Sequence, residues 1–86
     1  MNDEEEILTF ELRADKLELE IHLNEVGLKN LRQYLKNVER TGDHQHLMTE
    51  NWGGCELTSE KQGSDNELLE KVTVFFWPDG SSAPST

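Results

Sequence analysis

The sequence predicts an α+β fold, in which one helix packs on one face of an antiparallel sheet and the elements follow the order β-β-α-β-β-β. Three observations support it: two runs of alternating polarity near the start, a stretch of helical periodicity in the middle, and short strand-like runs in the second half. The 86 residues leave room for a single domain. We place this domain at residues 1–78 and expect a disordered tail at 79–86, where Gly, Ser, Ala and Pro dominate.

The first two strands are predicted to form an antiparallel hairpin with one wet face. Residues 7–13 and 17–23 both alternate in polarity, and a short polar turn separates them. Glu18, Glu20 and His22 are expected to point to water. The side chains expected to point toward the core are Leu8, Phe10, Leu12, Leu17, Leu19, Ile21 and Leu23.

A helix is predicted over residues 25–40. Asn24 suits its N-cap, and Gly42 can end it in the left-handed conformation. Its apolar stripe consists of Leu28, Leu31, Leu35 and Val38.

The second half is predicted to contain three further strands, at 44–49, 55–58 and 68–77, separated by loops at 50–54 and 59–66. The last strand carries apolar side chains on both faces, which is typical of a central strand or of one covered by a partner.

The chain is strongly acidic, with a formal net charge of -10 and a pI near 4.5. Phosphate would be repelled, so neither nucleic acid nor an anionic membrane is expected as a partner. A basic protein is the natural partner for such a surface, although acidity can also serve solubility alone. One cysteine allows no intramolecular disulfide, and no secretory signal or spanning apolar stretch is evident, so a cytoplasmic location is expected.

Catalytic and metal-binding patterns are weak. His44 and His46 would share a strand face and could begin a zinc or iron site, but such a pair is also common on a half-exposed strand. Glu18, Glu20 and His22 could imitate an acid/base cluster, yet their face is expected to be solvated. We therefore expect no enzymatic activity, no metal and no cofactor.

The sequence leaves alternatives open for the burial and role of three aromatic residues and of the cysteine. Trp52, beside two glycines, either covers the core or is displayed to a partner. Phe75 and Trp77 form a second core layer, a dimer contact or a partner patch. Cys55 is expected to be a small buried filler, with a reactive thiol as the alternative.

Residues 44–78 resemble the immunity protein 32 family. The resembling segments are His46-Leu47-Met48-Thr49, Trp52-Gly53-Gly54, Glu56-Leu57, Gly63, Asn66-Glu67-Leu68 and the closing Trp77-Pro78. The positions taken as the family motif are His46, Trp52, Gly53, Gly54 and Leu57. The resemblance implies a small protein of bacterial polymorphic-toxin systems that binds and blocks a cognate toxin.

The leading hypothesis is thus a toxin-neutralising immunity protein whose acidic face meets a basic toxin. The candidate toxin-binding residues are Glu18, Glu20, Glu50, Trp52 and Glu56. The main alternative is a homodimeric structural or adaptor domain without enzymatic activity, in which Phe75 and Trp77 meet their symmetry mates. A third possibility is a small metal-dependent enzyme that uses His44 and His46.

Overall fold

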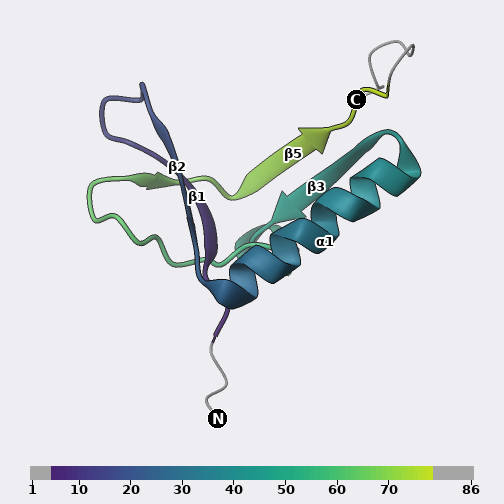
Figure 1. Cartoon of the computed structure of the whole chain (residues 1–86). Coiled ribbons are helices and arrows are strands. Elements are labelled where there is room, and N and C mark those ends of the chain that lie inside the picture. Colours follow the sequence, from purple (N-terminus) through teal and green to yellow (C-terminus); the bar gives the residue numbers. More distant parts are fainter. Residues whose placement is uncertain (1–4, 79–86) are drawn as a thin grey trace.

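The computed structural model describes residues 5–78, so the predicted tail at 79–86 lies outside the described residues. The α+β class and the β-β-α-β-β-β order are confirmed (Figure 1). In chain order the elements are β1 (Leu8–Leu12), β2 (Leu19–Leu23), α1 (Glu25–Thr41), β3 (His44–Met48), the 3₁₀ turn η1 (Glu50–Trp52), β4 (Glu67–Leu68) and β5 (Lys71–Phe75).

The strands form two antiparallel sheets, ordered β2-β1-β4 and β3-β5, where one sheet was predicted. The predicted strand at 68–77 is divided between them, because Leu68 pairs with β1 whereas Lys71–Phe75 pairs with β3. The chain crosses between the sheets just after β4, where the N–H of Leu69 donates to the carbonyl of Phe10 at 2.9 Å. In Figure 1 the two sheets diverge from a shared base, and α1 runs alongside β3.

The strand predicted at 55–58 is wrong. The N–H of Leu57 donates to the carbonyl of Met48 at 3.1 Å, whereas the N–H of Thr58 donates to the carbonyl of Leu8 at 2.9 Å. Because consecutive residues bond to different sheets, this segment ties the two sheets together and forms no ladder of its own; Leu57 makes an isolated bridge.

The helix α1 confirms the predicted helix and both of its predicted ends. Asn24 Oδ1 accepts a hydrogen bond from the N–H of Gly27 at 2.9 Å, which caps the first turn. Gly42 adopts φ 75°, and its N–H donates to the carbonyl of Val38 at 2.9 Å. Gly27 is also required sterically, since a Cβ there would lie 1.9 Å from the carbonyl oxygen of Ile7.

The hydrophobic core lies where the helix and both sheets meet. Its buried members are Leu8, Phe10, Leu47 and Leu57, and the partly buried residues packed against them are Leu31, Tyr34, Leu69, Val72 and Val74. No helix within residues 5–78 combines the length and apolarity that crossing a membrane would require.

The core-side face of the hairpin is only half covered, which corrects the predicted burial. Leu8 and Phe10 of β1 are 0% and 6% exposed, as expected. On β2, the outer strand of its sheet, and at Leu17 just before it, the residues predicted to point inward remain exposed. Their exposed fractions are 88% for Leu17, 49% for Leu19, 48% for Ile21 and 38% for Leu23.

The opposite face of the hairpin, predicted to be wet, is partly buried. Thr9 and Glu11 of β1 are fully buried, and Glu20 and His22 of β2 are half-buried. The loop at 59–66 covers this face through hydrogen bonds to the Glu11 carboxylate. The prediction of a solvated polar face is therefore wrong for Thr9 and Glu11 and only partly right for Glu20 and His22, whereas Glu18 is exposed as predicted.

Candidate functional site

A tight turn after β3 presents Trp52 at the surface. The N–H groups of Trp52 and Gly54 both donate to the carbonyl of Thr49, at 3.0 and 2.9 Å. Gly53 has φ 85°, a left-handed conformation that glycine adopts at no steric cost. Trp52 is 59% exposed, so the indole is displayed to solvent and does not cover the core.

Gly54 and Glu56 hold this turn against β3. A Cβ on Gly54 would lie 2.6 Å from the carbonyl oxygen of Met48, so the close approach requires glycine. Glu56 Oε1 accepts hydrogen bonds from the N–H of Met48 at 3.1 Å and from the N–H of Cys55 at 3.3 Å. The Glu56 side chain is half-buried and is therefore engaged within the fold.

An open hollow of about 320 Å³ adjoins the turn. It is lined by Glu6, Glu50, Gly54, Cys55, Leu57, Thr58 and Ser59. Glu50 is exposed, whereas Glu6 accepts a hydrogen bond from Asn30 Nδ2 at 2.9 Å. Cys55 is an exposed free thiol, so its expected role as a buried filler is wrong. The hollow thus combines acidic oxygens with an accessible thiol, and the exposed Trp52 follows Glu50 by two residues.

Glu18 and Glu20 lie at a different place, near the tip of the hairpin. Arg13 approaches both carboxylates, with Nε 3.4 Å from Glu18 Oε1 and Nη1 3.6 Å from Glu20 Oε2. His22 Nε2 lies 2.9 Å from Glu20 Oε1, and this hydrogen bond, followed by one from Asn66, lowers the pKa of Glu20. The Glu20 carboxylate is therefore engaged by partners within the protein, which favour its charged form.

The hollow beside Glu20, about 260 Å³ in volume, is lined by Arg13, Ala14, Glu20, Gly63, Ser64, Asp65 and Asn66. It shares no lining residue with the hollow beside Glu50. Glu50 and Trp52 therefore lie in the η1 turn and Glu56 follows it, whereas Glu18 and Glu20 lie elsewhere, near the tip of the hairpin.

Glu11 is a buried carboxylate whose structural role was not predicted from the sequence. It accepts hydrogen bonds from the Thr9 hydroxyl at 2.5 Å, the Gln62 N–H at 2.8 Å, the Gly63 N–H at 3.0 Å and the Asn66 side-chain amide at 2.9 Å. Burial raises the pKa of Glu11, but these hydrogen bonds, the strongest from Thr9, lower it to about 2. The carboxylate is therefore ionised at neutral pH and anchors the 59–66 loop.

Gly63 and Asn66 acquire their roles from this carboxylate. Asn66 is 8% exposed, and its amide contacts both Glu11 and Glu20. A Cβ on Gly63 would lie 2.4 Å from Asn66 Nδ2. Both residues belong to the segments of the sequence that resemble the family, and this was the sequence signal for a buried polar network here.

The histidines of β3 form an aromatic pair. The rings of His44 and His46 are 5.0 Å apart in an edge-on arrangement, and His44 also stacks on Phe75 at 5.5 Å. His46 Nδ1 lies 3.0 Å from the hydroxyl of Thr73. Across residues 5–78, no group of three or more His, Cys, Asp or Glu side chains could hold a metal ion.

The remaining motif positions and aromatic residues divide between core and surface. Leu57 is 5% exposed and belongs to the core, whereas His46 is exposed. Phe75 and Trp77 are 39% and 59% exposed, so they do not form a second layer of the core.

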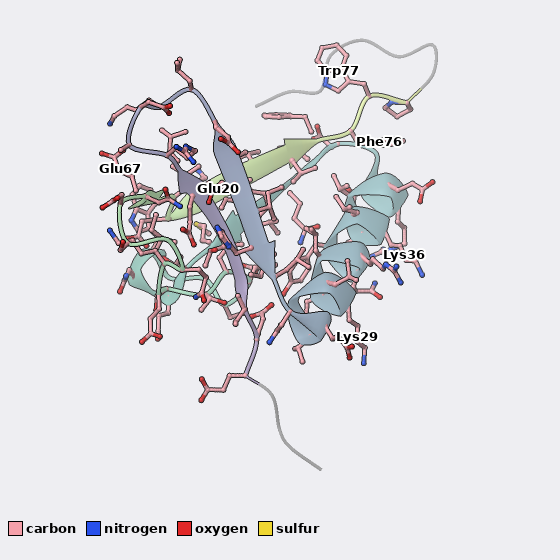
Figure 2. The ribbon with its side chains drawn as sticks, turned by 60° about the vertical axis from the view of Figure 1, so that its left-hand side comes forward. Glu20, Lys29, Lys36, Glu67, Phe76 and Trp77 are labelled. Atoms are coloured by element: carbon pink, nitrogen blue, oxygen red, sulfur yellow. The ribbon has the colours of Figure 1, made fainter. Side chains whose placement is uncertain are left out.

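Basic residues are concentrated on α1. The helix carries half of the chain's 8 Lys and Arg residues, namely Lys29, Arg32, Lys36 and Arg40, against Glu25 and Glu39. Figure 2 shows Lys29 and Lys36 projecting outward from the helix, on the side of the molecule away from Glu20 and Glu67.

The comparisons with known proteins identify one family. The family model described as immunity protein 32 matches residues 18–72. The match begins just before β2 and ends within β5, so it includes α1, whereas the resemblance in the sequence rested on the second half alone. No curated protein and no solved structure matches the chain.

Proposed function

The chain belongs to the immunity protein 32 family, and on that premise we propose that it binds a cognate bacterial toxin in the cytoplasm and neutralises it without catalysing a reaction. The observation that carries the proposed site is the η1 turn, which presents Trp52 with the neighbouring exposed carboxylate of Glu50. An aromatic anchor beside uncompensated charge is a combination typical of binding hot spots. The net charge of -10 supports a basic toxin surface as the partner.

Two binding contributions follow from this arrangement. Trp52 would bury its indole against the toxin and slow dissociation, because a large rigid side chain loses little entropy on burial. Glu50 would act mainly on association, since an exposed charge attracts an opposite charge before contact. Toxin activity would be blocked if the bound protein covers the cationic surface that receives the toxin's substrate.

The five predicted contact residues take different parts in this proposal. Glu50 and Trp52 are the proposed direct contacts. Glu18 would contribute only at longer range, because Arg13 lies 3.4 Å from its carboxylate. Glu20 and Glu56 would support the fold, because their carboxylates accept hydrogen bonds from within the protein.

The aromatic contribution is tested with two tryptophans of equal exposure. Trp52 and Trp77 are both 59% exposed, so Trp77→Ala is a matched control for Trp52→Ala. With the toxin encoded beside the gene, we expect Trp52→Ala to speed dissociation roughly 30-fold, corresponding to about 2 kcal/mol, and to weaken inhibition of toxin activity. Trp77→Ala should leave both unchanged. Equal effects of the two variants, measured by surface plasmon resonance, would argue against this site.

The electrostatic contribution is tested with one charge reversal on the η1 turn and one on the helix. Glu50→Lys and Glu39→Lys change the net charge equally, but Glu39 lies on the basic helix. We expect Glu50→Lys to reduce the association rate roughly tenfold at low salt and Glu39→Lys to reduce it much less. Association should also slow as salt rises. An association rate that does not change with salt would contradict the electrostatic contribution to binding. Whether the protein inhibits the toxin would still be decided by the toxin-activity assay.

A further inference from the structure

The outer edge of β2 is open for pairing with another strand. In the sheet order β2-β1-β4, β2 is bonded on one side to β1, and no described strand lies on its other side. Unpaired strand edges present a row of N–H and C=O groups to any chain that can add to them.

The alternation of hydrogen bonds along the hairpin identifies which backbone N–H and C=O groups of β2 face that edge. The N–H of Arg13 donates to the carbonyl of Glu18 at 3.0 Å, and the N–H of Asn24 donates to the carbonyl of Ile7 at 3.1 Å. In an antiparallel pair, residues alternate between bonding across the pair and pointing away from it. Since residues 18 and 24 bond inward, Leu19, Ile21 and Leu23 direct their backbone groups to the open edge.

The same residues leave apolar side chains uncovered. Leu19, Ile21 and Leu23 share one face of β2 and are 49%, 48% and 38% exposed. The segment Leu19–Leu23 contains no Pro and no Lys, the residues with which exposed edges are usually protected from pairing. This strand therefore offers both backbone and apolar groups to an added strand.

We propose that β2 pairs with β2 of a second copy of the chain, antiparallel about a two-fold axis at Ile21, so that two three-stranded sheets join into one. Ile21 then lies opposite the partner's Ile21, and Leu19 lies opposite the partner's Leu23. These residues exchange N–H and C=O bonds, because all of them point their backbone groups outward. Their apolar side chains meet on one face of the joined sheet.

Charge complementarity on the other face selects both the second copy and the register. With the axis at Ile21, Glu20 lies opposite the partner's His22, and His22 lies opposite the partner's Glu20. An axis at Glu20 would place two carboxylates opposite each other, and an axis at His22 would oppose two imidazoles. Like charges placed directly opposite destabilise a strand pair, whereas a carboxylate beside an imidazole can form a hydrogen bond. The strand is therefore complementary to itself in one register.

The helix position supports the same arrangement. A Cβ built on Gly27 lies 3.3 Å from Leu23 Cβ, so the start of α1 adjoins Leu23. Because Leu23 lies opposite the partner's Leu19, the axis brings the start of each helix toward the partner's exposed Leu19. Leu28, which is 38% exposed on the first turns of α1, can then contribute to covering it.

The association is tested with two lysine substitutions at exposed positions. Sedimentation of the full chain over a concentration series should show a monomer–dimer equilibrium. Ile21→Lys places two ammonium groups against each other at the axis and should weaken association at least 30-fold, whereas Trp77→Lys, two residues after the end of β5, should leave it unchanged. Both side chains are exposed, and circular dichroism should show that both variants remain folded. A wild-type chain that stays monomeric at millimolar concentration would refute the proposal, as would loss of the dimer in Trp77→Lys alone.

The register is tested by disulfide trapping. In a Cys55→Ser background, Ile21→Cys should form an intermolecular disulfide under mild oxidation, because directly opposite residues have Cα separations of about 5.5 Å, within the range of disulfides. A mixture of Leu19→Cys and Leu23→Cys chains should give mainly the mixed species by mass spectrometry. Neither chain should cross-link readily with itself, since residue 19 and the partner's residue 19 would lie roughly 13 Å apart. Equal cross-linking of self and mixed pairs would contradict this register.

Salt separates this association from toxin binding. Two chains of charge -10 repel each other, so raising salt should strengthen the dimer. Salt should weaken binding to a basic toxin. A dimer that weakens with salt would overturn the proposed apolar interface, and it would leave the test at Trp52 unaffected.

Discussion

In the β1–β2 hairpin, the apolar face is buried on β1 but not on β2, and part of the polar face is buried as well. On one face, Leu19, Ile21 and Leu23 are substantially exposed. On the other, Thr9 and Glu11 are fully buried. The alternation of a strand determines which residues share a face, but the elements that lie against each face determine which one is covered.

The polar face can be buried because its charge is matched by donors. The Glu11 carboxylate accepts hydrogen bonds from both main-chain and side-chain groups, including those of Gln62, Gly63 and Asn66. A buried carboxylate that lacked such partners would be strongly unfavourable. The apolar face of β2 stays open because the core ends at β1, beneath the helix.

The largest effect is expected from Glu11→Ala. This change leaves the N–H groups of Gln62 and Gly63 without their acceptor and removes one of the two acceptors of the Asn66 amide, and each unsatisfied buried group costs roughly 1–3 kcal/mol. We expect the free energy of unfolding to fall by about 4 kcal/mol, measured by urea denaturation. The exposed Glu60→Ala serves as the control and should change it by less than about 0.5 kcal/mol.

A small effect of Glu11→Ala would contradict this account of how the polar face is buried. It would mean that the 59–66 loop finds other acceptors, and the polar face would then be covered without depending on this carboxylate.

A somewhat smaller effect is expected from acid. The pKa of Glu11 is about 2 in the folded protein and 4.5 ordinarily, so ionisation favours the folded state. This contribution is fully present above pH 4.5 and is lost as the pH falls toward 2, for a total of about 3 kcal/mol. Glu11→Gln should abolish this part of the pH dependence. Chemical denaturation at stepwise pH measures both proteins, and parallel curves would contradict the assignment to Glu11.

The elements could be predicted from local patterns, because their signals are local. The helix between Asn24 and Gly42 follows from a capping residue, an apolar stripe and a glycine stop. Both end signals are found in the structure, whereas Leu28 and Leu35 of the stripe are 38% and 45% exposed. The hairpin follows from two alternating runs around a short turn. The division of the final strand could not be predicted, because it depends on Leu69 reaching Phe10 far along the chain.

The candidate site was predictable only in part, for a related reason. Trp52 was recognised as notable from its glycines, but its exposure depends on the η1 turn and on how that turn meets β3. Glu56 looked like a free surface acid, yet its carboxylate bonds to the N–H of Met48. Acidic residues in a chain this acidic cannot be sorted by sequence into structural and surface groups.

The smallest effect is expected on the open face, where Leu8 and Leu23 allow a direct comparison. They are the same residue type, lie opposite each other in the β1–β2 register and are 0% and 38% exposed. We expect Leu8→Ala to lower the free energy of unfolding by about 3 kcal/mol and Leu23→Ala by about 1 kcal/mol at low protein concentration. If β2 pairs with a second copy, the effect of Leu23→Ala should grow as protein concentration rises, because the dimer adds to the apparent stability. Urea denaturation at two protein concentrations measures this difference, and equal effects of Leu23→Ala at both would indicate that this face remains open in solution.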